Sequence, residues 1–294
     1  MNILTDVNQR LKLAREIQRL RAIQLVINKK IIAGEFLVPI HLAIGYEALA
    51  VSLAQVLDSA DKLMLTHRNI HYQLALGATE QQLADEYQLK STGLASGKLG
   101  SMNLMNPVAG NIYTSNILGN NMAVALGVGL ASKLKSDSGV IWAVTGDGAI
   151  EEGVFYESAL FASSVELPII FLVENNEWSL GTSIAERRTK IDLQTFASSL
   201  SIDYLHLSGN DPVNYLSQFQ KARIHALEKN RPMIIEADVH SLGGFYKEVA
   251  EGKKRYINYH AGAIRIEPDS NNIFESNDSD PLFVVSIDLA LGNL

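Results

Sequence analysis

The chain has 294 residues, of which 47% are apolar, with a formal net charge of −7 and no cysteine. The acidic balance argues against a nucleic-acid-binding protein, and the lack of cysteine excludes disulfides and thiolate chemistry. The lack of cysteine also fits a reducing compartment. No stretch has the apolar length of a signal peptide or a membrane span, so we expect a soluble, cytoplasmic protein without a membrane partner.

The first half of the chain predicts helices interrupted by one long loop. Apolar residues fall near helical spacing over residues 6–30, and shorter helices are expected over 45–57 and 79–87. Residues 91–111 are rich in Gly, Ser and Asn without a clean period, which predicts a loop, and a loop of this length is usually functional or disordered. A helix of small residues follows over 121–135.

The second half predicts buried strands separated by helices. Apolar runs over 140–146, 168–175 and 233–239 are typical of strands that are covered on both faces. Helices are expected over 151–165 and 212–228. Strand and helix in alternation indicate an α/β fold, with a parallel sheet flanked by helices.

The C-terminal part differs from the rest in composition. Residues 267–280 are acidic and polar, which predicts a linker or a disordered segment, whereas the last fourteen residues are apolar again. We therefore expect one domain over 1–266, followed over 267–294 by an acidic linker and a short tail that docks on this domain or on a partner.

Polar residues follow two of the predicted strands. Asp147 lies between Gly146 and Gly148 just after the first strand, and Asn175 and Asn176 end the second. Ligands of open α/β sheets bind at the carboxyl ends of the strands, so these side chains converge if the strands are neighbours. A carboxylate and an amide oxygen suit Mg²⁺, which takes few protein oxygens and completes its shell with phosphates and water. The glycines leave room for a diphosphate.

Other interpretations of this pattern are weaker. The lysine of a phosphate-binding Walker loop is missing, and the glycine spacing differs from the Gly-x-Gly-x-x-Gly dinucleotide fingerprint. If the pattern has no function, Gly-Asp-Gly is a plain turn and Asn-Asn a capped loop.

The stretch "GDGAIEEGVFYESALFASSVELPIIFLVENNEWSLGT" resembles the alpha subunits of the 2-oxo acid dehydrogenases of the pyruvate, acetoin and branched-chain types. The resemblance extends upstream through "HLAIGYEALA", "THRNIHYQLALG" and "SNILGNNMAVALGVGLASK" and downstream to "EADVHSLGG", and covers roughly residues 10 to 250. It implies a thiamine-diphosphate-binding fold, with thiamine diphosphate and Mg²⁺ as cofactors.

The resemblance also implies roles for particular residues around the metal. Asp147, Asn176 and the main-chain carbonyl of Trp178 would hold the magnesium ion. Gly148 and Ala149 would contact the diphosphate.

Four further residues fall on cofactor-binding positions of that family. Arg68 would bind the diphosphate, and an arginine suits such a contact because its guanidinium can bind two phosphate oxygens at once. His67 precedes it, as in acetoin-type relatives. The main chains of Asn116 and Leu118 would meet the aminopyrimidine ring.

Two histidines are the expected catalytic residues. The resemblance places His41 near the substrate and His240 on a mobile loop over the cofactor, and imidazole can move protons near neutral pH. His71 lies one turn beyond Arg68 and is equally expected to face the site or to be structural. The remaining three carry no motif, and we expect structural roles for His206, His225 and His260.

The implied activity needs other chains. In the two-subunit members of the family, a beta subunit supplies the glutamate that activates the cofactor, and the acyl unit from a small 2-oxo acid such as pyruvate passes to a lipoyl acyltransferase. Departures from the family pattern, such as Asn103 where histidine is common, keep other acceptors open. The alternatives are a thiamine-dependent carboligase or split-transketolase subunit acting on an aldehyde or sugar, and a degenerate scaffold subunit without catalysis.

Overall fold

The computed structural model describes residues 3–292, which form a six-stranded sheet in the order β2-β1-β3-β4-β8-β7. Every neighbouring pair in this sheet is parallel. The predicted α/β fold with a parallel sheet is thus confirmed. The strands are β1 (Lys62–Thr66), β2 (Asn111–Ser115), β3 (Ile141–Gly146), β4 (Ile169–Asn175), β7 (Asp203–Leu207) and β8 (Met233–Asp238).

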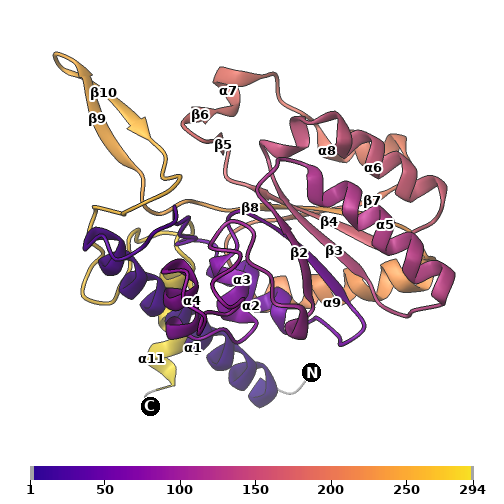
Figure 1. The fold of residues 1–294 in the computed structure, drawn as a ribbon, viewed down its shortest axis with the longest axis horizontal. Helices are drawn as coiled ribbons and strands as arrows, with labels where there is room; N and C mark the ends of the chain where they lie inside the picture. Colours follow the sequence, from indigo (N-terminus) through magenta and orange to yellow (C-terminus); the bar gives the residue numbers. More distant parts are fainter. Residues whose placement is uncertain (1–2, 293–294) are drawn as a thin grey trace.

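Helices cover both faces of the sheet (Figure 1). One face carries α5 (Asn120–Lys135), α6 (Gly153–Ser164) and α8 (Leu193–Ser199); the other carries α1 (Ile3–Ile32), α2 (Glu47–Ala54), α3 (Ile70–Ala75), α4 (Glu80–Tyr87) and α9 (Pro212–Lys229). These bounds agree with the helices expected from the sequence, apart from α3 and α8. Among residues 3–292, none of the helices combines the length and apolar content needed to cross a membrane.

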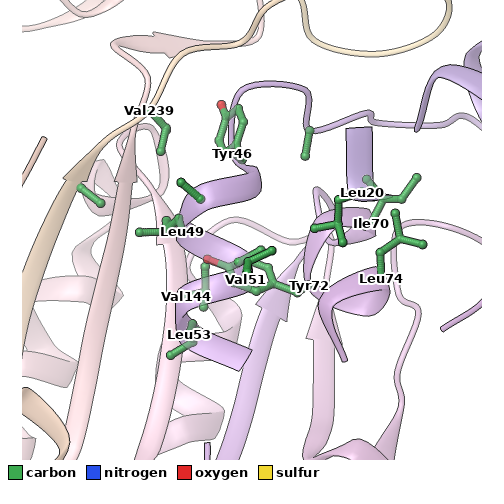
Figure 2. Close-up of a cluster of buried hydrophobic side chains, with 14 of the residues drawn as sticks. Leu20, Tyr46, Leu49, Val51, Leu53, Ile70, Tyr72, Leu74, Val144 and Val239 are labelled. Carbon is green, nitrogen blue, oxygen red and sulfur yellow. The ribbon is translucent and has the colours of Figure 1, made fainter. Parts of the chain in front are cut away.

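The two faces bury separate apolar clusters, because side chains alternate along each strand. In β3, Trp142 and Val144 pack toward α2 and α9, whereas Ile141 and Ala143 pack toward α5 and α6. Figure 2 shows Leu49 of α2 beside Val144 on the first of these faces. Burial on both faces explains why β3 and β4 are apolar along their whole length.

Several elements were missed by the sequence analysis. β1, β2 and β7 have polar residues at or near their ends, and β2 and β7 are the edges of the sheet, where one side needs no strand partner. A hairpin of β9 (Phe245–Ala250) and β10 (Lys253–Ile257) stands off the body (Figure 1). Every residue of β9 is exposed, so no burial pattern could indicate it. Four shorter elements are β5 (Trp178–Ser179), β6 (Thr182–Ser183), α7 (Ile184–Arg187) and the tail helix α10 (Pro281–Val284).

The Gly-rich stretch predicted as a loop is ordered by one buried carboxylate. Both oxygens of Glu86, at the end of α4, accept main-chain N–H groups of Ala95, Gly97, Leu99 and Gly100 at 2.8 to 3.1 Å. Glu86 is fully buried. Four such bonds satisfy its charge without a cation and fix the path of the loop toward the sheet edge.

The acidic stretch 267–280, expected to be a linker, is packed against the domain at its end. Arg21 of α1 is fully buried and pairs with Glu47 at 2.7 Å and with Asp280 at 2.9 Å. Its Nη1 also donates to the main-chain oxygen of Asn272 at 2.8 Å. After Asp280, α11 (Ser286–Leu291) packs on α1, so the tail docks on this domain, one of the two options expected.

Asp280→Ala should destabilise the protein by about 3 kcal/mol, because it removes one of the two carboxylates that balance a buried guanidinium. Urea unfolding followed by circular dichroism measures the loss. The matched control is Asp278→Ala, at an exposed position two residues earlier, and should have little effect. Equal stability of the two variants would contradict a structural role for the Arg21–Asp280 pair.

Candidate active site

The ends of β3 and β4 bring the two polar motifs together. The strands are neighbours with Gly146 opposite Glu174, and the N–H of Asp147 donates to the carbonyl of Glu174 at 3.2 Å. Since carboxyl ends of parallel strands meet at one edge of the sheet, Asp147 and Asn176 line the same cavity, which has a volume of about 310 Å³.

Most of the expected site residues line this cavity, and His240 does not. The lining residues include His41, His67, Arg68, Asn116, Leu118, Asp147, Gly148, Ala149, Asn176 and Trp178. His240 is exposed and borders an adjoining cavity of about 610 Å³. Its neighbours Val239 and Ser241 are buried, and this alternation turns the His240 side chain outward.

Asp147 is a buried carboxylate with an arginine partner. Arg187, the last residue of α7, places Nη2 at 2.5 Å from Oδ2 of Asp147 and Nε at 2.6 Å from Glu151. Arg188 pairs with Glu151 as well, at 2.6 Å. Burial raises the pKa of Asp147 to about 6, and the guanidinium of Arg187 opposes that rise.

Asn176 is held by hydrogen bonds on both ends of its amide. Its Nδ2 donates to the hydroxyl of Tyr46 at 2.8 Å and to Oγ of Ser241 at 3.2 Å. Its Oδ1 accepts the N–H of Trp178 at 3.0 Å. Because the amide nitrogen is turned toward two hydroxyls, the orientation of the amide oxygen is fixed. Burial raises the pKa of Tyr46, which keeps its hydroxyl protonated.

The cavity wall fits a hard cation beside a diphosphate. The carboxylate of Asp147 and the amide oxygen of Asn176 are the oxygen donors that Mg²⁺ prefers. Gly148 is needed for close packing here, because a Cβ at this position would lie 2.5 Å from Oγ of Ser179. Gly148 also lines the cavity, so its main chain can meet a ligand there.

A second buried carboxylate lies beside the metal motif. Oε1 of Glu174 accepts the hydroxyl of Tyr72 at 2.8 Å and lies 3.1 Å from Nε2 of His71. Glu174 lines the cavity, whereas His71 is fully buried behind it and is not among the lining residues. Burial, with the Glu174 charge, raises the pKa of Tyr72 well above its ordinary value.

Arg68 brings a positive charge to the opposite wall of the cavity. Its guanidinium donates to the main-chain oxygens of Leu42 and, at 2.9 Å, of His260. It also lies over the rings of Tyr46 and Tyr259, each with a centroid 5.7 Å away. These contacts hold the guanidinium in one place at the cavity wall.

Three histidine rings gather beside Arg68. The centroid of His41 lies 4.8 Å from that of His67 and 5.0 Å from that of His260, and the latter two are 5.6 Å apart. Burial, followed by the charge of Arg68, lowers the pKa of both His67 and His260 to about 4. Burial, followed by the neighbouring imidazoles and Arg68, lowers the pKa of His41 to about 3. The three rings are therefore neutral at pH 7.

Sequence reasoning missed four residues of this site. His260 was expected to be structural, yet it lines the cavity; only the fold brings the segment after β10 against His41. Arg187 and Ser241 make contacts that no local spacing indicates, and Tyr259 supports Arg68. The "RR" pair at 187–188 after the asparagines was the one available signal for Arg187.

Comparison with known proteins identifies the family. Residues 13–247 match the family described as dehydrogenase E1 component. The chain belongs to this family. It is 28% identical over 69% of its length to the pyruvate dehydrogenase E1 component subunit alpha of Rickettsia bellii, and 28% identical over 82% to the mitochondrial protein of that name from Dictyostelium discoideum. The corresponding protein of Rhizobium meliloti is 29% identical over 67% of the chain.

The matches cover only part of these relatives. They span 63% of the Rickettsia and Dictyostelium proteins and 56% of the Rhizobium protein. A transketolase structure from Campylobacter jejuni aligns with all of the chain and with 48% of its own, with a TM-score of 0.58 and 16% identity. At this identity the likeness concerns the fold alone, and it agrees with a parallel sheet flanked by helices.

The histidine group should make stability pH-dependent. In the unfolded chain imidazoles take up protons as the pH falls below about 6.5, whereas the folded rings do so only near pH 4, so protonation favours unfolding within this window. The stability these groups contribute is complete above pH 6.5 and is lost as the pH falls toward 4. The urea concentration at the unfolding midpoint of resin-treated, metal-free protein should therefore decrease as the pH is lowered from 7 to 5.

His260→Gln should flatten this dependence, because it removes one titrating group, and should leave the opposing contribution of Asp147 in place. His225→Gln is the matched control, since His225 pairs with Asp203 away from the cavity. An unchanged slope in His260→Gln would show that this imidazole titrates alike in folded and unfolded chains.

Proposed function

We propose that this E1 chain is the alpha subunit of a thiamine-diphosphate-dependent 2-oxo acid dehydrogenase that works in the cytoplasm. The observation that carries the proposal is the convergence of Asp147, Asn176 and Arg68 on one cavity at the carboxyl edge of the sheet. Two oxygen donors and a fixed guanidinium are the groups needed to hold a magnesium ion and a diphosphate.

The chain's own residues divide into binding and positioning roles. Asp147, Asn176 and the carbonyl of Trp178 would hold Mg²⁺. Arg187, which pairs with Asp147 in this structure, would have to give up that contact when the metal binds. Gly148 and Ala149 would present main chain to the diphosphate. Thiamine diphosphate, when bound, supplies the electron sink that lets a 2-oxo acid lose carbon dioxide.

Residues on the other walls would orient the cofactor and the substrate. Arg68, with His67 beside it, would face the diphosphate, and the main chains of Asn116 and Leu118 would face the aminopyrimidine ring. His41 is neutral, so one ring nitrogen can donate a hydrogen bond to the substrate and the other can accept one. His240 would have to move from the adjoining cavity to contact the cofactor.

The proposed enzyme includes a beta subunit. The beta chain would supply the glutamate that activates the cofactor, in a heterotetramer of two alpha and two beta chains, and a lipoyl acyltransferase would accept the acyl unit. The names of the relatives support this assignment, since each is a subunit alpha of a pyruvate dehydrogenase E1 component.

One observation favours a second candidate, a carboligase or split-transketolase subunit that serves an aldehyde or sugar acceptor. Asn103, which departs from the family pattern, accepts the N–H of Asn116 through Oδ1 at 3.2 Å. Asn103 therefore contacts the main chain of a residue that lines the cavity and is exposed, where an acceptor would enter. Assaying the reconstituted complex with a lipoyl domain and with glycolaldehyde would separate the two candidates.

Asp147→Ala should abolish magnesium-dependent binding of thiamine diphosphate by the chain purified with its beta partner, because the metal loses its only carboxylate ligand. Isothermal titration calorimetry measures the affinity. Asp137→Ala, at an exposed position, is the control and should bind as the wild type does. Unchanged affinity in Asp147→Ala would refute the metal assignment.

The isolated chain should not decarboxylate pyruvate or another 2-oxo acid, even with saturating thiamine diphosphate and Mg²⁺, because the activating glutamate belongs to the beta chain. Carbon dioxide release, measured with and without the beta chain, tests this. Substantial turnover by the isolated chain would refute the division of the site between two subunits.

A further inference from the structure

The three histidines beside Arg68 form a group that the family motifs mark only in part. One ring nitrogen of each of His41, His67 and His260 lies within 4.8 Å of the others. They come from three separate segments: the loop before α2, the residue that follows β1 and the irregular segment after β10. All three line the cavity, and His260 has no role in the proposed function.

Some hydrogen-bonding groups of His41 and Arg68 have no protein partner among the described residues. Among the described residues, none bonds to the buried Nδ1 of His41. The guanidinium of Arg68 has five N–H groups, and the carbonyls of Leu42 and His260 take one from each terminal nitrogen. Donors therefore remain that can face a ligand in the cavity.

The charge of Arg68 decides which ligand suits this wall. Three neutral imidazoles alone could bind a transition metal, which needs their lone pairs. A guanidinium beside them repels a cation and attracts an anion. The rings can donate N–H groups to oxygen, and a bound anion would favour their protonated form, which strengthens the contact.

We propose that His260 adds a ligand to the wall where Arg68, His41 and His67 already lie, and that its imidazole contacts the bound anion directly. The carbonyl of His260 also holds Arg68, so this one residue positions the charge and adds a donor beside it. The identity of the anion rests on the proposed function: it is either the diphosphate of the cofactor or the carboxylate of the substrate.

His260→Leu tests the imidazole separately from the carbonyl, because the substitution keeps the main chain that holds Arg68. Resin-treated, metal-free full-length protein is titrated with inorganic pyrophosphate and, separately, with pyruvate, by calorimetry in two buffers of different protonation enthalpy. Wild type should bind with net proton uptake at pH 7. His260→Leu should weaken binding about tenfold or more and reduce the uptake, as expected for the loss of a charge-assisted hydrogen bond.

The two probes separate the sources. Weakening for pyrophosphate alone indicates a diphosphate subsite, and weakening for pyruvate alone indicates a carboxylate subsite; both support the proposal. The control is His225→Gln, which should match the wild type, and His67→Gln repeats the test should His260→Leu fail to fold.

Two results would overturn the inference. Wild-type affinity and proton uptake in the His260 and His67 variants would show that the imidazoles do not contact the anion. Tight cobalt binding with visible absorption bands that both variants lose, together with unchanged anion binding, would show a transition-metal site instead. Either result leaves the proposed function standing if thiamine diphosphate still binds with magnesium and fails to bind in Asp147→Ala.

Discussion

The parallel pairing of β3 with β4 is the constraint on which the rest of the site depends. It sets Gly146 opposite Glu174 and so places Asp147 and Asn176, which are 29 positions apart in number, on one cavity wall. The crossover through α6 fixes this register by burying Phe155, Ala159 and other apolar residues against the strands. A one-residue slip would move each strand's side chains to the opposite face and would separate the two oxygen donors.

The cavity carries charges that are balanced differently on its two sides. Around Asp147 the pairs are ionic, with Arg187 shared between Asp147 and Glu151. Around Arg68 the guanidinium is held by carbonyl oxygens and tyrosine rings, which carry no net charge, and no carboxylate among residues 3–292 pairs with it. An anion can therefore be drawn to the Arg68 side, whereas a divalent cation can bind Asp147 only where it replaces Arg187 as the partner of the carboxylate.

The sequence predicted the central elements because their signals are local. Apolar runs identify β3, β4 and β8, and helical periodicity identifies α1 and α9. Asp147 and Asn176 were found for the same reason, since they follow strand ends, whereas His41 and Arg68 were found through the family resemblance. Contacts such as His260 with His41, Ser241 with Asn176 and Asp280 with Arg21 join segments 65 to 259 residues apart, and no local pattern encodes them.

The Glu86 carboxylate has a consequence for how the cavity rim can change between related proteins. It binds main-chain amides of this loop and none of the side chains, so the side chains of Ala95 and Leu99 can differ while the path of the loop is kept. Gly93 and Gly97 do not share this freedom, because a Cβ would lie 2.6 Å from the main chain of Glu86 in the first and 2.5 Å from the main chain of Leu89 in the second. The loop continues directly to Met102 on the cavity wall. Selectivity at the rim can thus evolve by substitution on a fixed backbone, without rebuilding the loop.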